Sequence, residues 1–148
     1  MIGQFVELTE ANIGTVAPLY VDVFNAPPWN VDWSLAAATE RLSSFSEFPR
    51  FLGQGHIREK KPVAFVMGWG ERWSNGWVFH IKEMGVALAA QRSGVGRELL
   101  STFERHLVTQ NYMSVYLETG ASTPAQQFYE HCGYKTIGLV SLHKKLYA

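Results

Sequence analysis

The chain has 148 residues, of which 47% are hydrophobic and 18% are charged, and these values are typical of one globular domain with a buried core. Its 13 basic and 13 acidic side chains cancel, so the overall charge gives no reason to expect a nucleic-acid partner. The single cysteine, Cys132, excludes an internal disulfide and a cysteine-rich zinc site. We therefore predict no metal site.

The N-terminus and the apolar stretches give no sign of a membrane-targeted protein. Residues 1–5 lack the basic region and apolar run of a signal peptide. No uncharged apolar stretch reaches the ~18 residues that are needed to span a bilayer. We expect a cytoplasmic protein without a membrane partner.

The hydrophobic period changes several times between strand-like and helix-like spacing along the chain. In chain order, the predicted elements are a strand at 4–8, helices at 13–24 and 33–46, strands at 51–58, 63–73 and 77–87, a helix from 95 to about 110, a strand at 114–118, a helix at 124–131, and one or two strands within 134–146. This order predicts an α/β chain of the α+β type. We expect a single domain over residues 1–148, built on a mixed, mostly antiparallel central sheet of six to seven strands with about four flanking helices.

Turn and cap residues mark the boundaries of several of these elements. The pair Pro27-Pro28 ends the first helix, and either Asp32 or Ser34 caps the second. Asn75-Gly76 predicts a tight hairpin, because both residues accept positive φ angles. Gly133 is expected to end the last helix.

The segment Gln91–Gly96 lies between a predicted strand and an amphipathic helix. Gly94 and Gly96 leave backbone N–H groups uncovered, and the N-terminus of the helix adds the positive end of its dipole. Arg92 and Arg97 can add charge assistance. The segment is neither the dinucleotide fingerprint, which needs a third glycine, nor a Walker loop. On these residues alone, an anion site and an ordinary strand-to-helix turn are equally open.

Two motifs place this turn in a wider pattern. Glu83 and Val86 at the end of a strand precede Gln91-x-x-Gly-x-Gly96, and a later helix carries Phe128-Tyr129-Glu130-His131-Cys132-Gly133-Tyr134. Together with the order of elements along nearly the whole chain, these motifs resemble the GCN5-related N-acetyltransferase (GNAT) family.

The resemblance implies a V-shaped opening between the parallel strands 77–87 and 114–118, in which acetyl-coenzyme A (acetyl-CoA) binds as the acetyl donor. Loop N–H groups would hold its pyrophosphate, and backbone near Met84 would pair with its pantetheine arm. The residues assigned to cofactor binding in this way are Met84, Gly85, Val86, Gln91, Arg92, Ser93, Gly94, Val95, Gly96, Arg97 and Ser122. The chain departs from the family pattern at Leu88, where proline is common, at Ala90, where an aromatic is frequent, and at Ser122, where asparagine is common. Only the last departure concerns a side-chain contact to the pantetheine arm.

Two side chains are the predicted catalytic groups. Tyr129 matches the family tyrosine that can donate a proton to the coenzyme A sulfur, and a phenol with a pKa near ~10 is protonated at neutral pH; a core tyrosine is the alternative. Glu83 lies on a strand that lines the opening and is the candidate general base; the alternative is a solvated side chain paired with Lys82 or Arg97. His80, which simple alternation places on the opposite strand face from Glu83, is a reserve candidate.

The segments that would wall the acceptor pocket are rich in aromatic residues, which suit a cationic amine; packing is the alternative explanation. The candidate acceptor-binding residues are Phe24, Trp29, Trp33 and Trp69. We expect an acetyl-CoA-dependent N-acetyltransferase that transfers the acetyl group directly to a small-molecule amine. A non-catalytic acyl-CoA-binding sensor and a peptide or protein N-acetyltransferase are the alternatives. Because members of the family are often dimers, a homodimer is also considered.

Overall fold

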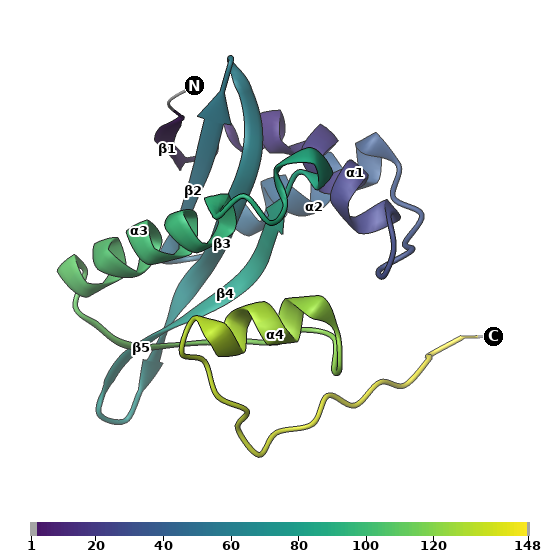
Figure 1. Ribbon diagram of the computed structural model, residues 1–148. Helices are drawn as coiled ribbons and strands as arrows, with labels where there is room; N and C mark the ends of the chain where they lie inside the picture. The colour runs from purple at the N-terminus through teal and green to yellow at the C-terminus, as the bar shows by residue number, and fades with distance from the viewer. Residues whose placement is uncertain (1–2, 148) are drawn as a thin grey trace. The chain divides into compact units, whose positions relative to one another are not determined.

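The computed structural model describes residues 3–147 (Figure 1). The chain divides into two compact units, one that ends at Glu118 and one that begins at Thr119, and each is described by itself. The expectation of a single domain over residues 1–148 stays a prediction. No helix within residues 3–147 has both the length and the apolar character that a membrane crossing requires.

The helices and strands follow the predicted order. The first unit contains β1 (Gln4–Leu8), η1 (Ile13–Val16), α1 (Ala17–Asn25), α2 (Leu35–Ser46), β2 (Phe51–Arg58), β3 (Lys61–Trp73), β4 (Gly76–Val86), η2 (Leu88–Ala90), α3 (Val95–Thr109) and β5 (Tyr112–Leu117), and the second contains α4 (Pro124–His131). The bounds of β1, β2 and α4 are those predicted. The mixed α/β architecture with four α-helices is confirmed.

The sheet has the strand order β1-β2-β3-β4-β5. The first three pairings are antiparallel and the last, between β4 and β5, is parallel. Within residues 3–147 the sheet therefore has five strands, and the prediction of six to seven strands is wrong.

The missing strands are those predicted within residues 134–146, where the described chain has no regular structure. Its apolar side chains are exposed, including Leu139 at 73% and Leu142 at 91%. The backbone hydrogen bond from Leu139 N–H to the Ile137 carbonyl, 2.8 Å long, is local. A strand forms only beside a hydrogen-bonded neighbour, so a strand-like apolar pattern without such a neighbour does not produce one.

Helix boundaries follow from the residues that cap them. At the start of α2, the Ser34 hydroxyl oxygen accepts a hydrogen bond from Ala37 N–H over 3.1 Å, which selects Ser34 over Asp32 as the cap. After α4, Gly133 has φ +94°, and the N–H of Tyr134 bonds the Tyr129 carbonyl over 3.0 Å. The predicted end at Gly133 is confirmed, because glycine adopts this left-handed conformation without a steric cost.

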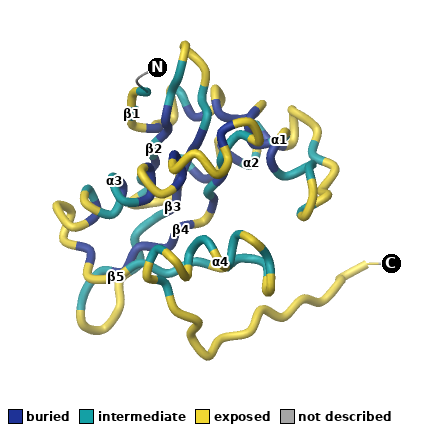
Figure 2. The backbone as a smooth tube through the Cα atoms, in the orientation of Figure 1, coloured by how far each residue is buried: buried dark blue, intermediate teal, exposed yellow. Residues whose placement is uncertain are grey.

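The two faces of the sheet are covered by different helices. On β3, Phe65 packs with α1 and α2, where its ring centroid lies 6.0 Å from that of Tyr20. On β4, Phe79 lies 5.3 Å from Phe103 of α3. Figure 2 shows buried residues along the middle strands. Burying side chains of this size contributes about 1.5–3 kcal/mol each, so both helical layers hold β4 in place.

Candidate functional site

The strands β4 and β5 are paired over only part of the length of β4. Their register runs from Trp77 opposite Tyr112 to Ile81 opposite Leu117, where β5 ends. The next part of β4, residues 82–86, is paired with β3 on one side from Glu83 onward and has no partner strand among residues 3–147 on the other. The pairing of the two parallel strands therefore ends at Ile81, and the edge of β4 beyond it is open in the sense that no strand of the described chain pairs with it.

The loop that follows β4 is shaped by its own side chains. Gln91 donates a hydrogen bond from Nε2 to the Val86 carbonyl over 3.1 Å, and the Ser93 hydroxyl donates to the Ala90 carbonyl. Gly94 has φ +88°, and in the described part of the chain a Cβ added to it would meet no atom within 4 Å apart from the adjoining backbone. The loop therefore holds a fixed turn with open space in front of Gly94.

The helix α3 begins directly after this turn, with Gly94 as its N-cap. The bond from Glu98 N–H to the Gly94 carbonyl, 3.0 Å long, is the first turn of the helix ladder. The N–H groups at the start of an α-helix have no acceptor within the helix and carry the positive end of its dipole. Residues 91–94 are exposed. This combination of open space, N–H donors and dipole fits a phosphate group.

An extra residue interrupts the pairing of β3 with β4. Glu83 lies opposite Met67, whereas Ile81 lies opposite Gly68, so Lys82 has no partner on β3. This arrangement is a β-bulge, which bends a strand and changes the face to which the following side chains belong.

The bulge decides where His80 and Glu83 lie. His80 is opposite Trp69 and Glu83 is opposite Met67, and these two β3 residues share a face because they are two positions apart. His80 and Glu83 therefore lie on the same face of β4. The prediction of opposite faces is wrong, since simple alternation does not count the bulged residue. Gly68 allows the close approach: a Cβ there would lie 1.8 Å from the His80 carbonyl oxygen.

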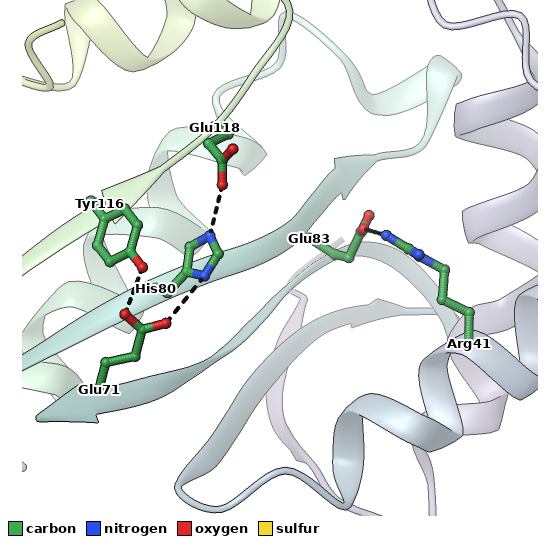
Figure 3. Close-up of polar contacts among 6 residues, drawn as sticks. All are labelled: Arg41, Glu71, His80, Glu83, Tyr116 and Glu118. Carbon is green, nitrogen blue, oxygen red and sulfur yellow. Dashed lines mark hydrogen bonds and ion pairs between the residues drawn. The ribbon is translucent and has the colours of Figure 1, made fainter. Parts of the chain in front are cut away.

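Glu83 is 9% exposed and forms an ion pair with Arg41 of α2, with 2.8 Å between Oε1 and a guanidinium nitrogen (Figure 3). The alternative of a solvated Glu83 carboxylate is therefore wrong, and the ion-pair partner found here is Arg41. Burial, and then the negative charge of Glu83, raises the pKa of the neighbouring Tyr20 above its ordinary value. The phenol is thus protonated and can act as a hydrogen-bond donor beside this ion pair.

Three of the four candidate acceptor-binding aromatics, Phe24, Trp29 and Trp33, lie around the end of α1. The Asn25 side chain holds the backbone of Trp33 with two hydrogen bonds, 2.8 and 3.0 Å long. Phe24 and Trp29 have ring centroids 5.9 Å apart, and the Arg41 guanidinium lies 5.5 Å from the Trp33 ring. Of these three residues, Trp33 therefore borders the Arg41–Glu83 ion pair, and Phe24 and Trp29 contact each other at the end of α1.

The fourth candidate, Trp69, belongs to a second aromatic group. Its ring lies 4.3 Å from Phe48 and 5.5 Å from Phe45. The Arg41 guanidinium is 4.7 Å from the Phe45 ring, so it links this group to the first. On the neighbouring strand, His80 also contacts Trp69: the two ring centroids are 5.6 Å apart and the rings meet edge-on.

A polar cluster surrounds His80, and sequence reasoning had singled out only the histidine (Figure 3). Glu71 Oε2 lies 3.8 Å from His80 Nδ1, and Glu118 Oε1 lies 3.5 Å from Nε2. The Tyr116 hydroxyl donates to Glu71 Oε1 over 2.6 Å. In residues 3–147 no three His, Cys, Asp or Glu side chains are arranged to hold a metal ion, so the cluster is described by its hydrogen bonds and charges.

Two predicted site residues belong to the second unit. Ser122 donates its N–H to Gln126 Oε1 over 2.6 Å. Tyr129 of α4 has ring contacts with Phe128 at 5.2 Å and Tyr134 at 5.8 Å. Their assignments to cofactor binding and proton donation stay predictions.

Several solved structures share this fold at low sequence identity. An integron cassette protein from the mobile metagenome of V. cholerae has a TM-score of 0.80 at 15% identity, covering 98% of this chain and 93% of that chain. An aminoglycoside acetyltransferase from an uncultured soil metagenomic sample, in complex with trehalose, has a TM-score of 0.77 at 17% identity, covering 98% and 97%. An aminoglycoside N-acetyltransferase in complex with CoA has a TM-score of 0.76 at 12% identity, covering 98% and 95%. At these identities the likeness concerns the fold.

The sequence of the chain identifies its family more directly than the individual structures do. No sequence among the curated proteins matches the chain. The sequence model of the Acetyltransferase (GNAT) family matches residues 19–134, a span that includes the bulged strand β4, the loop before α3 and the helix α4. The chain therefore belongs to the GNAT family of acetyltransferases.

Proposed function

We propose that the chain is an acetyl-CoA-dependent N-acetyltransferase that moves the acetyl group directly to the amine of a small molecule. The observation that carries this proposal is the open edge of β4 at residues 82–86, which leads directly into the Gly94 turn. A strand edge next to a phosphate-sized turn suits an elongated ligand with amides at one end and phosphates at the other.

Different groups of the chain would bind different parts of such a ligand. Acetyl-CoA, when bound, supplies the acetyl group as an activated thioester. Main-chain groups of Met84, Gly85 and Val86 are the candidates for pairing with the pantetheine amides, as an added strand would. N–H groups of residues 93–96 are the candidates for the pyrophosphate, with charge from Arg92 and Arg97. Gln91 and Ser93 contribute by fixing the turn.

The acceptor half of the site is the face of β4 that carries Glu83 and His80. Aromatic side chains border it on both sides of Arg41, and they can shield a cationic amine from water while contributing cation–π attraction. Two of the similar structures are aminoglycoside acetyltransferases by name, which supports a small-molecule amine as the acceptor class.

A screen for thiol release tests the function directly. The purified protein is incubated with acetyl-CoA and a panel of polyamines, aminoglycosides, amino acids and peptides, and free thiol is measured. We expect release above the background hydrolysis rate with at least one small amine. Release with peptides alone would favour a protein acceptor, and no release with any amine would favour a non-catalytic acyl-CoA sensor.

Replacing Tyr129 by phenylalanine is expected to lower kcat by about tenfold or more, because the thiolate leaves more slowly without a proton donor. The affinity for acetyl-CoA, measured by calorimetry, should stay nearly the same. Tyr134→Phe, on the same unit, is the matched control and should keep its kcat. Equal rates for wild type and Tyr129→Phe would remove Tyr129 from the mechanism.

A further inference from the structure

We propose that His80 is the group that takes the proton from the acceptor's ammonium, and that Glu71 and Glu118 hold it for this role. This inference rests on the proposed acetyl transfer and specifies its proton acceptor and the charge of its substrate. It starts from a cluster that unites three strands: Glu71 from β3, His80 from β4, and Tyr116 of β5 with Glu118 directly after it.

The imidazole ring is held in one plane by its aromatic neighbours. Tyr116 stacks on it with a centroid distance of 4.5 Å and an interplanar angle of 4°. Trp69 meets it edge-on at 86°. A ring packed on two sides in this way cannot turn freely, so its two nitrogens point in fixed directions. Fixed orientation is what a proton-transfer group requires.

The two nitrogens have different surroundings. Nδ1 faces Glu71, whose other oxygen is fixed by the Tyr116 hydroxyl at 2.6 Å. A carboxylate accepts hydrogen bonds and does not donate them, so Glu71 and Glu118 each favour a proton on the ring nitrogen that they face. Glu71 is fixed by Tyr116, whereas the side chain of Glu118 is 64% exposed and its charge is screened by water. We therefore assign the proton to Nδ1 and the lone pair to Nε2. This arrangement follows the logic of an acid–histidine pair, in which the carboxylate orients the base.

The cluster lies where the pairing of β4 with β5 ends. His80 is opposite Tyr116, and the following pair, Ile81 with Leu117, is the last of the ladder. Glu118 comes next and its side chain is 64% exposed, whereas His80 between the two carboxylates is 11% exposed, so the imidazole is shielded and the Glu118 carboxylate is in contact with water. Because of the bulge, His80 shares its face with Glu83 and the aromatic residues of the acceptor half.

The charge state of His80 suits a base. Desolvation lowers its pKa below the ordinary value and the Lys82 charge acts in the same direction, whereas Glu71 and Glu118 act to raise it. These three side chains and the protonated Tyr116 phenol are the titratable groups that act on the ring from β3, from β4, from β5 and from the residue directly after β5. With its pKa lowered, the imidazole is neutral at neutral pH and has a lone pair to accept a proton.

The proton-transfer step balances within these groups. An N–H bond of the acceptor ammonium breaks, its electron pair stays on the amine nitrogen, and an N–H bond forms at Nε2. The resulting imidazolium lies between two carboxylates, which stabilise its charge, and the proton leaves to water past the exposed Glu118. The same carboxylates attract the ammonium before transfer. The site therefore selects amines that are cationic in solution over neutral amines and alcohols.

Glu83 is the competing base, and its contacts distinguish it from His80. One of its oxygens is bonded to Arg41 at 2.8 Å, so a proton acceptor at this position would have to act beside a fixed positive charge. The nearby ion pair is better suited to holding the acceptor in place. Substitutions at His80 and Glu83 are therefore expected to have different pH signatures.

The test uses the full chain and the amine with the highest rate in the thiol-release screen. We expect kcat/KM of the wild type to rise with pH as His80 loses its proton, which gives an acidic limb. His80→Gln should lower kcat by about 10²–10³-fold and remove this limb, with unchanged acetyl-CoA affinity by calorimetry. His106→Gln, near the end of α3, is the matched control and should keep both the wild-type kcat and the acidic limb of the pH profile.

Glu118→Gln provides a second, surface variant in case His80→Gln does not fold. Removing this negative charge lowers the pKa of His80 further, so the acidic limb should move to lower pH, and KM for the cationic amine should rise by about tenfold. A structural role for the cluster would not move the limb.

Two results would overturn the proposal and leave the acetyltransferase function standing. One is a His80→Gln enzyme with wild-type kcat and the same acidic limb, and the other is an acidic limb that stays in place in Glu118→Gln. If the wild type released no thiol with any amine, the proposed function and this inference would both be wrong.

Discussion

Replacement of Gly94 by valine is expected to weaken acetyl-CoA binding by at least about a hundredfold, which is about 2.7 kcal/mol. Gly94 has φ +88°, a conformation that costs residues with a Cβ about 1–2 kcal/mol and is rarer still for β-branched ones. The valine either distorts the turn or projects its methyl groups into the open space before the loop. Both outcomes remove the approach of a phosphate to the N–H groups.

Calorimetric titration with acetyl-CoA measures this effect, and thermal unfolding checks that the variant is folded. Among residues 3–147, no atom outside the adjoining backbone lies within 4 Å of the added Cβ, so the fold should survive. Gly14→Val is the matched control, because Gly14 also has open space around it but lies in η1. Unchanged affinity in Gly94→Val would show that the phosphate groups bind elsewhere.

Replacement of Arg41 by methionine is expected to destabilise the protein by about 2 kcal/mol. Removal of one partner from a fully buried ion pair costs about 3–5 kcal/mol, because the other charge is left buried without compensation. Arg41 is 32% exposed whereas Glu83 is 9% exposed, so water screens part of the effect. The double variant Arg41→Met with Glu83→Gln should recover most of the lost stability, since no isolated carboxylate then remains.

Urea unfolding of the wild type, both single variants and the double variant measures the coupling between the two side chains. In the same set, Glu83→Gln should lower kcat and leave acetyl-CoA affinity nearly intact, as expected for a group in the acceptor half. It should also keep the acidic limb of the pH profile. A Glu83→Gln enzyme without that limb would make Glu83, not His80, the proton acceptor. If the stability losses of the two single variants add up to that of the double variant, the ion pair contributes no coupling energy.

Features that depend on nearby residues could be predicted from the sequence. The bounds of β2 and α4 were predicted because hydrophobic period, caps and turn residues are local signals. The glycine turn before α3 and the family motifs likewise fall within short segments. Ser34 and Gly133 show the same point at single residues, since each satisfies backbone groups of its own helix.

Features that depend on distant residues or on register could not be predicted. Arg41 and Glu83 are 42 positions apart, and both Lys82 and Arg97 were nearer choices in sequence. The Asn75-Gly76 hairpin alone would have placed Glu71 near His80, but nothing local shows that Tyr116 and Glu118 of a parallel strand complete the cluster. The strands predicted within 134–146 failed for the same reason, because an apolar pattern does not reveal whether a partner strand exists.

The bulge at Lys82 has a consequence for how this segment can vary among homologous sequences. Deletion of Lys82 would remove the bulge but leave Glu83 opposite Met67, two positions after His80 and on the same face. Regular pairing of Lys82 with Met67 would instead carry Glu83 to the side of the sheet that packs against α3, where a carboxylate meets an apolar layer. The bulge thus decides the face on which Glu83 lies, whereas the identity of the exposed residue 82 hardly matters. We expect homologues to carry many residue types at position 82 or to lack this residue, to keep the bulge wherever the residue is present, and to keep a glycine at the position of Gly68.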